Sequence, residues 1–91
     1  MDYTEIKQQR YEEVKSGIDE KISQGYLPNI KAMEKQVLAL KRRIKVLYNG
    51  GALFADTLEK AEQTNKAIAK LEGEMAAYKV FIDIYYSNLK K

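Results

Sequence analysis

The 91-residue chain contains no cysteine and no histidine. Without cysteine it can form no disulfide and no thiolate metal site, and without histidine it lacks the commonest general base of enzymes. The hydroxyl groups of Ser16, Ser23 and Ser87 have no recognisable activating partner in the sequence. We therefore predict a protein that is not an enzyme and that uses no metal ion and no cofactor.

The chain also has only five glycines and one proline. Apolar residues make up 45% of it and charged residues 32%. This composition is typical of an ordered helical protein rather than a disordered one. No apolar run approaches the roughly 20 residues that a membrane-spanning helix needs. The first residues lack the pattern of a signal peptide. We expect a cytoplasmic protein with no membrane span.

The spacing of apolar residues predicts a single all-α domain with three helices, over residues 2–24, 29–48 and 52–89. Asp2 and Glu5 have the spacing of a capping box, and Gly25 has the place of a helix stop. Pro28 then interrupts the chain because it has no amide hydrogen and disfavours helix at the residue before it. The Asn-Gly-Gly stretch at 49–51 tolerates left-handed backbone, so it predicts the turn before the third helix.

The second and third helices carry a coiled-coil-like heptad pattern, which predicts packing along a continuous seam. The seam of the second helix steps by three and four residues and consists of Ile30, Met33, Val37, Leu40, Ile44 and Leu47. In the third helix one apolar position recurs every seven residues, at Phe54, Ala61, Ile68, Met75, Ile82 and Leu89. We expect the third helix to bend at Gly73, since glycine is a poor helix former.

The predicted helices differ in length, which leaves two arrangements open. At about 1.5 Å per residue, the third helix is about 57 Å long and the first two are about 33 and 30 Å long. Either the first two helices lie end to end along the third as a kinked antiparallel hairpin, or all three form a bundle from which the third helix protrudes.

The segment 75–86, MAAYKVFIDIYY, is apolar at ten of its twelve positions. A helix that is apolar around most of its circumference must be buried around most of it, and the first helix alone is too weakly patterned to cover it. A β-strand is the alternative, because many of these side chains favour strands, but the chain offers no second strand to pair with it. A membrane anchor is disfavoured because the polar strip of this helix carries little positive charge.

We therefore predict that this segment contacts a second chain, either another copy of the protein or a protein partner. The predicted interface consists of Met75, Tyr78, Phe81, Ile82, Tyr85, Tyr86 and Leu89. A less specific alternative is a small-ligand pocket between helices, lined by Tyr78 and Tyr85.

Residues 29–48 carry six basic and one acidic side chain, so this helix has a net charge of +5. Its basic face consists of Lys31, Lys35, Lys41, Arg42, Arg43 and Lys45. Such a face can contact nucleic acid or an acidic protein. Alternatively it is a solvated surface that complements the acidic first helix, with its Glu12, Glu13, Asp19 and Glu20. No helix-turn-helix or RNA-binding signature accompanies it, which disfavours sequence-specific reading.

The tripeptide Tyr48-Asn49-Gly50, midway between two heptad-patterned helices, resembles the Trp-x-Gly turn of the WXG100 family of small secreted helical hairpins. The resemblance implies a dimeric substrate of type VII secretion. The chain differs from that family by having Tyr48 in place of tryptophan, Pro28 in the first arm and no Tyr-x-x-x-[Asp/Glu] signature near its C-terminal end.

These observations together predict a non-enzymatic protein–protein interaction module that acts through helix packing as a homo-oligomer. Small proteins of this kind include phage and mobile-element proteins that inhibit a host factor, which is a general expectation for the class. The alternative function is a nucleic-acid-binding accessory protein that uses the basic face, and the weaker alternative is a WXG100-like secreted hairpin.

Overall fold

The computed structural model describes residues 2–26, 28–54 and 58–89, with their side chains except those of residues 50–54. Within these residues there are three α-helices and no strand: α1 (Tyr3–Ser23), α2 (Ile30–Phe54) and α3 (Leu58–Leu89). The all-α prediction is confirmed, and the strand alternative for the apolar segment is wrong.

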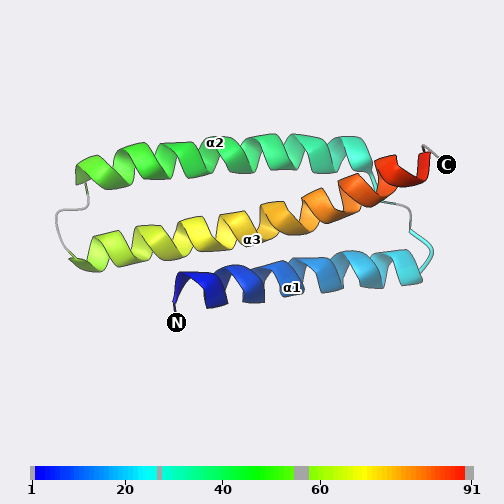
Figure 1. Cartoon of the computed structure of the whole chain (residues 1–91), viewed down its shortest axis with the longest axis horizontal. Coiled ribbons are helices and arrows are strands. Elements are labelled where there is room, and N and C mark those ends of the chain that lie inside the picture. Colours follow the sequence, from blue (N-terminus) through cyan, green and yellow to red (C-terminus); the bar gives the residue numbers. More distant parts are fainter. Residues whose placement is uncertain (1, 27, 55–57, 90–91) are drawn as a thin grey trace.

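Helix α3 lies between the other two, as Figure 1 shows. Helix α1 runs in the same direction as α3, whereas α2 runs antiparallel to both. Over the described residues α3 packs against α1 and α2, while no Cα atom of α1 lies within 8 Å of one in α2. The molecule measures 50 × 23 × 19 Å. The helices therefore lie side by side in one layer with α3 in the middle, and this layer is not flat, since its cross-section measures 23 × 19 Å. This is the three-helix alternative rather than the end-to-end hairpin.

Both ends of α1 follow the predicted signals. A side-chain oxygen of Asp2 accepts a hydrogen bond from the Glu5 backbone amide at 2.9 Å, which caps the first turn. At the other end Gly25 has a φ of 93°, and the Tyr26 amide donates to the Lys21 carbonyl at 3.0 Å. This is the glycine-terminated helix end that satisfies carbonyls of the last turn.

Helix α2 begins and ends differently. Asn29, directly after Pro28, caps its start by accepting a hydrogen bond from the Ala32 amide at 3.0 Å. The helix then continues to Phe54, so the turn predicted at 49–51 is wrong and α3 begins at Leu58 rather than at 52.

The glycines of that stretch permit a left-handed backbone but do not require it. A helical glycine costs only about 1 kcal/mol relative to alanine. Packing of α2 along α3 can offset this cost. Because Tyr48-Asn49-Gly50 lies inside α2, it does not form the turn on which the WXG100 resemblance depends. The connection between α2 and α3 falls at 55–57, outside the described residues.

The heptad seam of α2 is its buried face. Ile30, Val37 and Leu40 are buried, and the other three seam residues are half-buried. On α3 the seam is buried at Ile68 but is exposed again at its end; the Phe54 side chain lies outside the described residues. Among the described large side chains, Leu40 and Ile68 are the two with less than 2% of their surface exposed. The core is therefore small and lies where the middle parts of α2 and α3 face each other.

Gly73, the position expected to bend α3, lies inside an unbroken helix and serves close packing instead. A methyl group added there would lie 2.5 Å from the backbone oxygen of Lys7 and 3.0 Å from Cβ of Arg10. Ala69 and Ala77, one turn to either side, are completely buried. This row of small residues lets the backbone of α1 approach α3 closely, which only glycine permits at its centre.

Candidate interaction surfaces

The second half of α3 is left largely uncovered. None of the residues from Tyr78 to Leu89 is buried, although the segment is rich in apolar side chains. The most exposed large ones form what we call the apolar end: Ile84 (51% exposed), Tyr85 (43%), Tyr86 (45%) and Leu89 (63%). They lie within the last two turns of α3, on more than one side of the helix, and exposed apolar side chains so close together indicate a contact surface.

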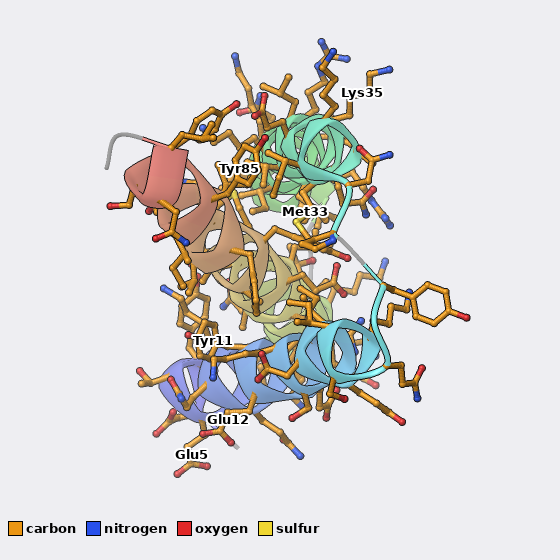
Figure 2. The ribbon with its side chains drawn as sticks, turned by 90° about the vertical axis from the view of Figure 1, so that its right-hand side faces the viewer. Glu5, Tyr11, Glu12, Met33, Lys35 and Tyr85 are labelled. Carbon is orange, nitrogen blue, oxygen red and sulfur yellow. The ribbon has the colours of Figure 1, made fainter. Side chains whose placement is uncertain are left out.

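The exposure of the apolar end follows from the direction of α3. Ile84 lies three turns beyond Gly73 and so points to the same side, toward α1. Figures 1 and 2 show α3 inclining away from α1 as it nears Leu89, and Figure 2 shows its end displaced to one side of the other two helices. Ile22, at the corresponding end of α1, is 41% exposed. Both isoleucines are therefore exposed at the same end of the molecule, and Ile22 lines an open groove that Ile84 does not border.

On its other side the apolar end is attached to the start of α2. The Tyr86 hydroxyl donates a hydrogen bond to the Glu34 carboxylate, and this bond is the main reason why the pKa of Tyr86 is raised above its ordinary value. The rings of Tyr85 and Tyr86 meet edge to face, with centroids 5.4 Å apart. The hydroxyl of Tyr86 is thus held while its ring stays accessible, which suits a contact surface.

The structure divides the predicted interface into two groups. Tyr85, Tyr86 and Leu89 are exposed, and the half-buried remainder consists of Met75, Tyr78, Phe81 and Ile82. The sequence prediction omitted Ile84, because Ile84 lies on the side of Gly73 and not on the heptad seam. Counting three helical turns from Gly73 would have placed Ile84 on the same side of α3.

All six residues of the predicted basic face are exposed: Lys31, Lys35, Lys41, Arg42, Arg43 and Lys45. Figure 2 shows Lys35 pointing away from the other two helices. None of the six forms a hydrogen bond or an ion pair with another described residue. The basic face is therefore available for an anionic partner.

The acidic side chains of α1 do not neutralise this face. They lie on the far side of α3, and Figure 2 shows Glu12 pointing out of the molecule opposite to Lys35. Their ion pairs stay within α1: Glu13 pairs with Arg10 at 3.1 Å and Asp19 with Lys15 at 3.5 Å. The two charged surfaces thus form opposite edges of the helical layer.

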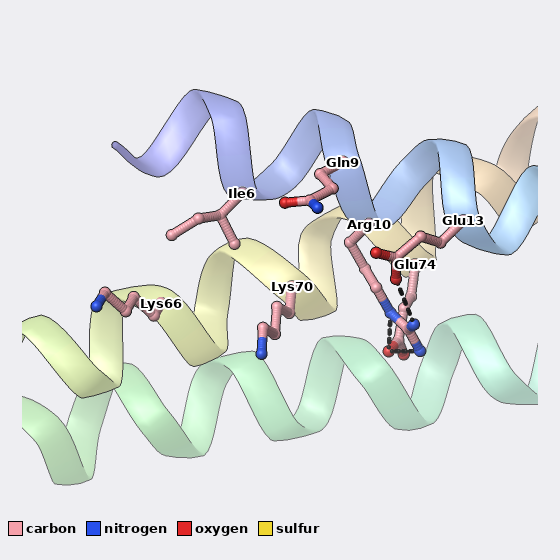
Figure 3. A pocket seen from close by; sticks show the side chains of 7 residues that line it. All are labelled: Ile6, Gln9, Arg10, Glu13, Lys66, Lys70 and Glu74. Carbon is pink, nitrogen blue, oxygen red and sulfur yellow. Dashed lines mark hydrogen bonds and ion pairs between the residues drawn. The ribbon is translucent and has the colours of Figure 1, made fainter. Parts of the chain in front are cut away.

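A cleft of about 580 Å³ lies between α1 and α3 (Figure 3). At one end the Arg10 guanidinium donates to Glu74 through Nε at 2.8 Å, and its Nη2 lies 2.7 Å from the same carboxylate oxygen. The bonds to Glu74, followed by that to Glu13, raise the pKa of Arg10. Because both carboxylates are held by this guanidinium, the arrangement clamps α1 to α3. Lys66 and Lys70 also line the cleft. Arg10 and Glu74 are 64 positions apart, so no local pattern in the sequence indicates this pair.

A second, open groove of about 910 Å³ lies between the end of α1, the connector and the start of α2, with Tyr78 of α3 in its wall. Apolar lining comes from Val14, Ile18 and Met33 among others. Tyr85, which the small-ligand alternative also required, does not line it. This groove therefore contains only one of the two tyrosines.

Among the described residues no group of acidic side chains could hold a metal ion. In the same part of the chain, no helix has the length and apolar character to cross a membrane. Comparison of the chain with protein-family models, with curated proteins and with solved structures finds no match. The candidate surfaces therefore have to be judged on their own geometry and chemistry.

Proposed function

We propose that this protein is a non-enzymatic interaction protein that associates with a second copy of itself through the apolar end of α3. The observation that carries the proposal is that a strongly apolar segment, residues 78–89, contains no buried residue. A partner that removes apolar surface from water gains about 25 cal/mol of free energy for each Å² covered. These exposed side chains therefore favour association.

A second copy is the simplest partner because a two-fold contact uses the same surface twice. Each copy would place its apolar end beside that of the other, so the exposed Ile84 and Leu89 would be covered on both chains at once. Tyr85 and Tyr86 suit such a contact, since tyrosine gives a large contact area with few rotatable bonds. The small core of the single chain, with Leu40 and Ile68 at its centre, makes additional burial between chains valuable for stability.

The test is the solution mass over a dilution series, measured by sedimentation or light scattering in high salt. We expect the mass to rise from that of one chain to that of two as the concentration increases. Changing Ile84→Lys and Leu89→Lys together should keep the chain monomeric. The matched control is Leu58→Lys, since Leu58 is 77% exposed at the opposite end of α3, and this variant should still dimerise. A monomeric wild-type chain at high concentration, or equal loss in the control, would contradict the proposal.

A further inference from the structure

We infer that copies of this chain also join edge to edge, with the outer face of α1 in one copy lying on the outer face of α2 in the next. The contact pairs an acidic stripe with a basic stripe. The acidic stripe consists of Glu5, Glu12 and Asp19, and the basic stripe consists of Lys31, Lys35, Arg42 and Lys45. These surfaces are separate from the apolar end, so this contact can exist without the proposed dimer.

The two stripes have the same length. Glu5, Glu12 and Asp19 follow one another at intervals of seven residues, which keeps them on one side of a helix. The stripe spans fourteen residues, or about 21 Å at about 1.5 Å per residue. Lys31 and Lys45 are also fourteen residues apart, so the basic stripe has the same extent.

The stripes cannot meet within one chain. They lie at opposite edges of the layer, with α3 between them, and Figure 2 shows Glu5 and Glu12 pointing away from the molecule on one side and Lys35 on the other. A second copy shifted sideways presents its acidic edge to the basic edge of the first. Because this contact joins two different surfaces, it leaves one of each kind free and can repeat along a row of copies.

The direction of the helices sets the register of this contact. Since α1 and α2 run antiparallel in the layer, a copy shifted without rotation places the start of α1 beside the end of α2. Glu5 then lies near Lys45 and Asp19 near Lys31. Glu12 lies opposite Leu38, which is 55% exposed and stands between Lys35 and Arg42 in the basic stripe. Each acidic side chain therefore has a cation within reach.

The side chains of both stripes are available for such pairing. The four cations have no partner among the described residues. Glu12 accepts one hydrogen bond, from Gln8 at 3.2 Å, and Asp19 is held by Lys15 at 3.5 Å, both within α1. Exposed ion pairs are weak one at a time and are screened by salt, with a Debye length of about 10 Å at 0.1 M and about 3 Å at 1 M. The edge contact should therefore depend on several pairs and disappear at high salt.

The test uses two charge-reversed chains, both built with Ile84→Lys and Leu89→Lys so that the apolar contact is absent. The first carries Lys31→Glu, Lys35→Glu, Arg42→Glu and Lys45→Glu, which makes both edges acidic. The second carries Glu5→Lys, Glu12→Lys and Asp19→Lys, which makes both edges basic. Each chain alone should stay monomeric at 50 mM salt, whereas an equal mixture should form larger particles that dissociate in 1 M salt.

A matched control separates the position of the charges from their number. Reversing four other exposed lysines to Glu, at Lys21, Lys66, Lys70 and Lys79, changes the net charge equally but leaves both stripes intact. Built with the same Ile84→Lys and Leu89→Lys changes, this chain should still self-associate at 50 mM salt through the edge contact. If the mixture of reversed chains stays monomeric, the inference is wrong. In that case we would test binding of a thymidine oligonucleotide. If it binds the unreversed chain but not the chain with four Glu on α2, the basic stripe is a nucleic-acid contact instead.

Discussion

Two consecutive segments of α3, which we call its buried half (68–77) and its open half (78–89), differ in burial in the opposite sense to their hydrophobicity. Residues 68–77 include Ile68, Ala69, Leu71, Gly73 and Ala77, all buried. Residues 78–89 contain larger apolar side chains, yet none of them is buried. Burial in this helix is therefore decided by how closely its neighbours approach, and not by how apolar its own sequence is.

Side-chain size on the side facing α1 explains the difference. Where that side carries Ala69, Gly73 and Ala77, the two backbones come so close that a methyl group at the glycine would meet Lys7. Where it carries Ile84, a side chain of that size prevents such a close approach, and α3 inclines away from α1 (Figures 1 and 2). The small residues hold one half of the helix in the layer, and the large residues leave the other half open to a partner.

The largest effect should come from the buried half. Ile68→Ala removes a side chain that is only 1% exposed, and such a change typically costs about 2–5 kcal/mol through lost transfer energy and the remaining cavity. Leu58→Ala, on the exposed start of the same helix, should change the free energy of unfolding by less than about 0.5 kcal/mol. Urea unfolding of both variants at equal protein concentration measures the difference; similar losses would show that the core lies elsewhere.

The close approach at Gly73 can be broken by one methyl group. Overpacking costs about 1–3 kcal/mol, and the better helix propensity of alanine returns about 1 kcal/mol, so we expect Gly73→Ala to lower stability by up to about 2 kcal/mol. Gly17→Ala is the matched control, because nothing lies within 4 Å of a methyl group there. It should raise stability by roughly 0.5–1 kcal/mol. Equal effects in urea unfolding would contradict the packing role of Gly73.

The clamp between Arg10 and Glu74 should have a smaller effect. Glu74→Gln removes the charge from a pair whose side chains are 38% and 19% exposed, and we expect a loss of about 1 kcal/mol after allowing for solvent screening. Asp19→Asn changes the net charge equally but breaks only the exposed pair with Lys15, and should cost about 0.3 kcal/mol. The comparison is made by urea unfolding at low and high salt, and the difference between the variants should shrink as salt is added.

The smallest effect concerns the attachment of the open half to α2. The hydrogen bond to Glu34 raises the pKa of Tyr86 above the unfolded value, which is about 10. The stabilising effect of this hydrogen bond is therefore complete below about pH 10. It is lost as the pH rises through the higher pKa that Tyr86 has in the folded protein. Absorbance titration of the phenolates should show that Tyr86→Phe removes a component that ionises late. Loss of an early component instead would contradict the Tyr86 assignment.

Much of the fold could be predicted from local patterns. The cap at Asp2, the stop at Gly25 and the seam of α2 each depend on residues within a few turns of one another. The cap at Asn29, which the predicted helix 29–48 included as a helical residue, is seen only in the structure. The turn predicted at 49–51 failed because glycine allows a reversal of the chain without imposing one, so the helix continues where the chain can keep it along α3.

The candidate surfaces were predicted in part. The six basic residues of α2 are exposed, as the position of the buried seam of that helix implies. The segment that ends α3 was identified from its hydrophobicity, but which of its side chains are exposed depends on the path of α1 and α2. For that reason Ile84 was missed and Met75 proved to be half-buried.

By itself the sequence determined the helical class, the ends of α1, the buried face of α2 and the strongly apolar character of the end of α3, because these are properties of neighbours along one helix. The tertiary structure decided that α3 lies in the middle, that Gly73 is a contact and that Arg10 reaches Glu74 across 64 residues. It also decided that the acidic and basic faces lie on opposite edges. These features depend on the distances between helices, which are set by the sizes of side chains that are far apart in the chain.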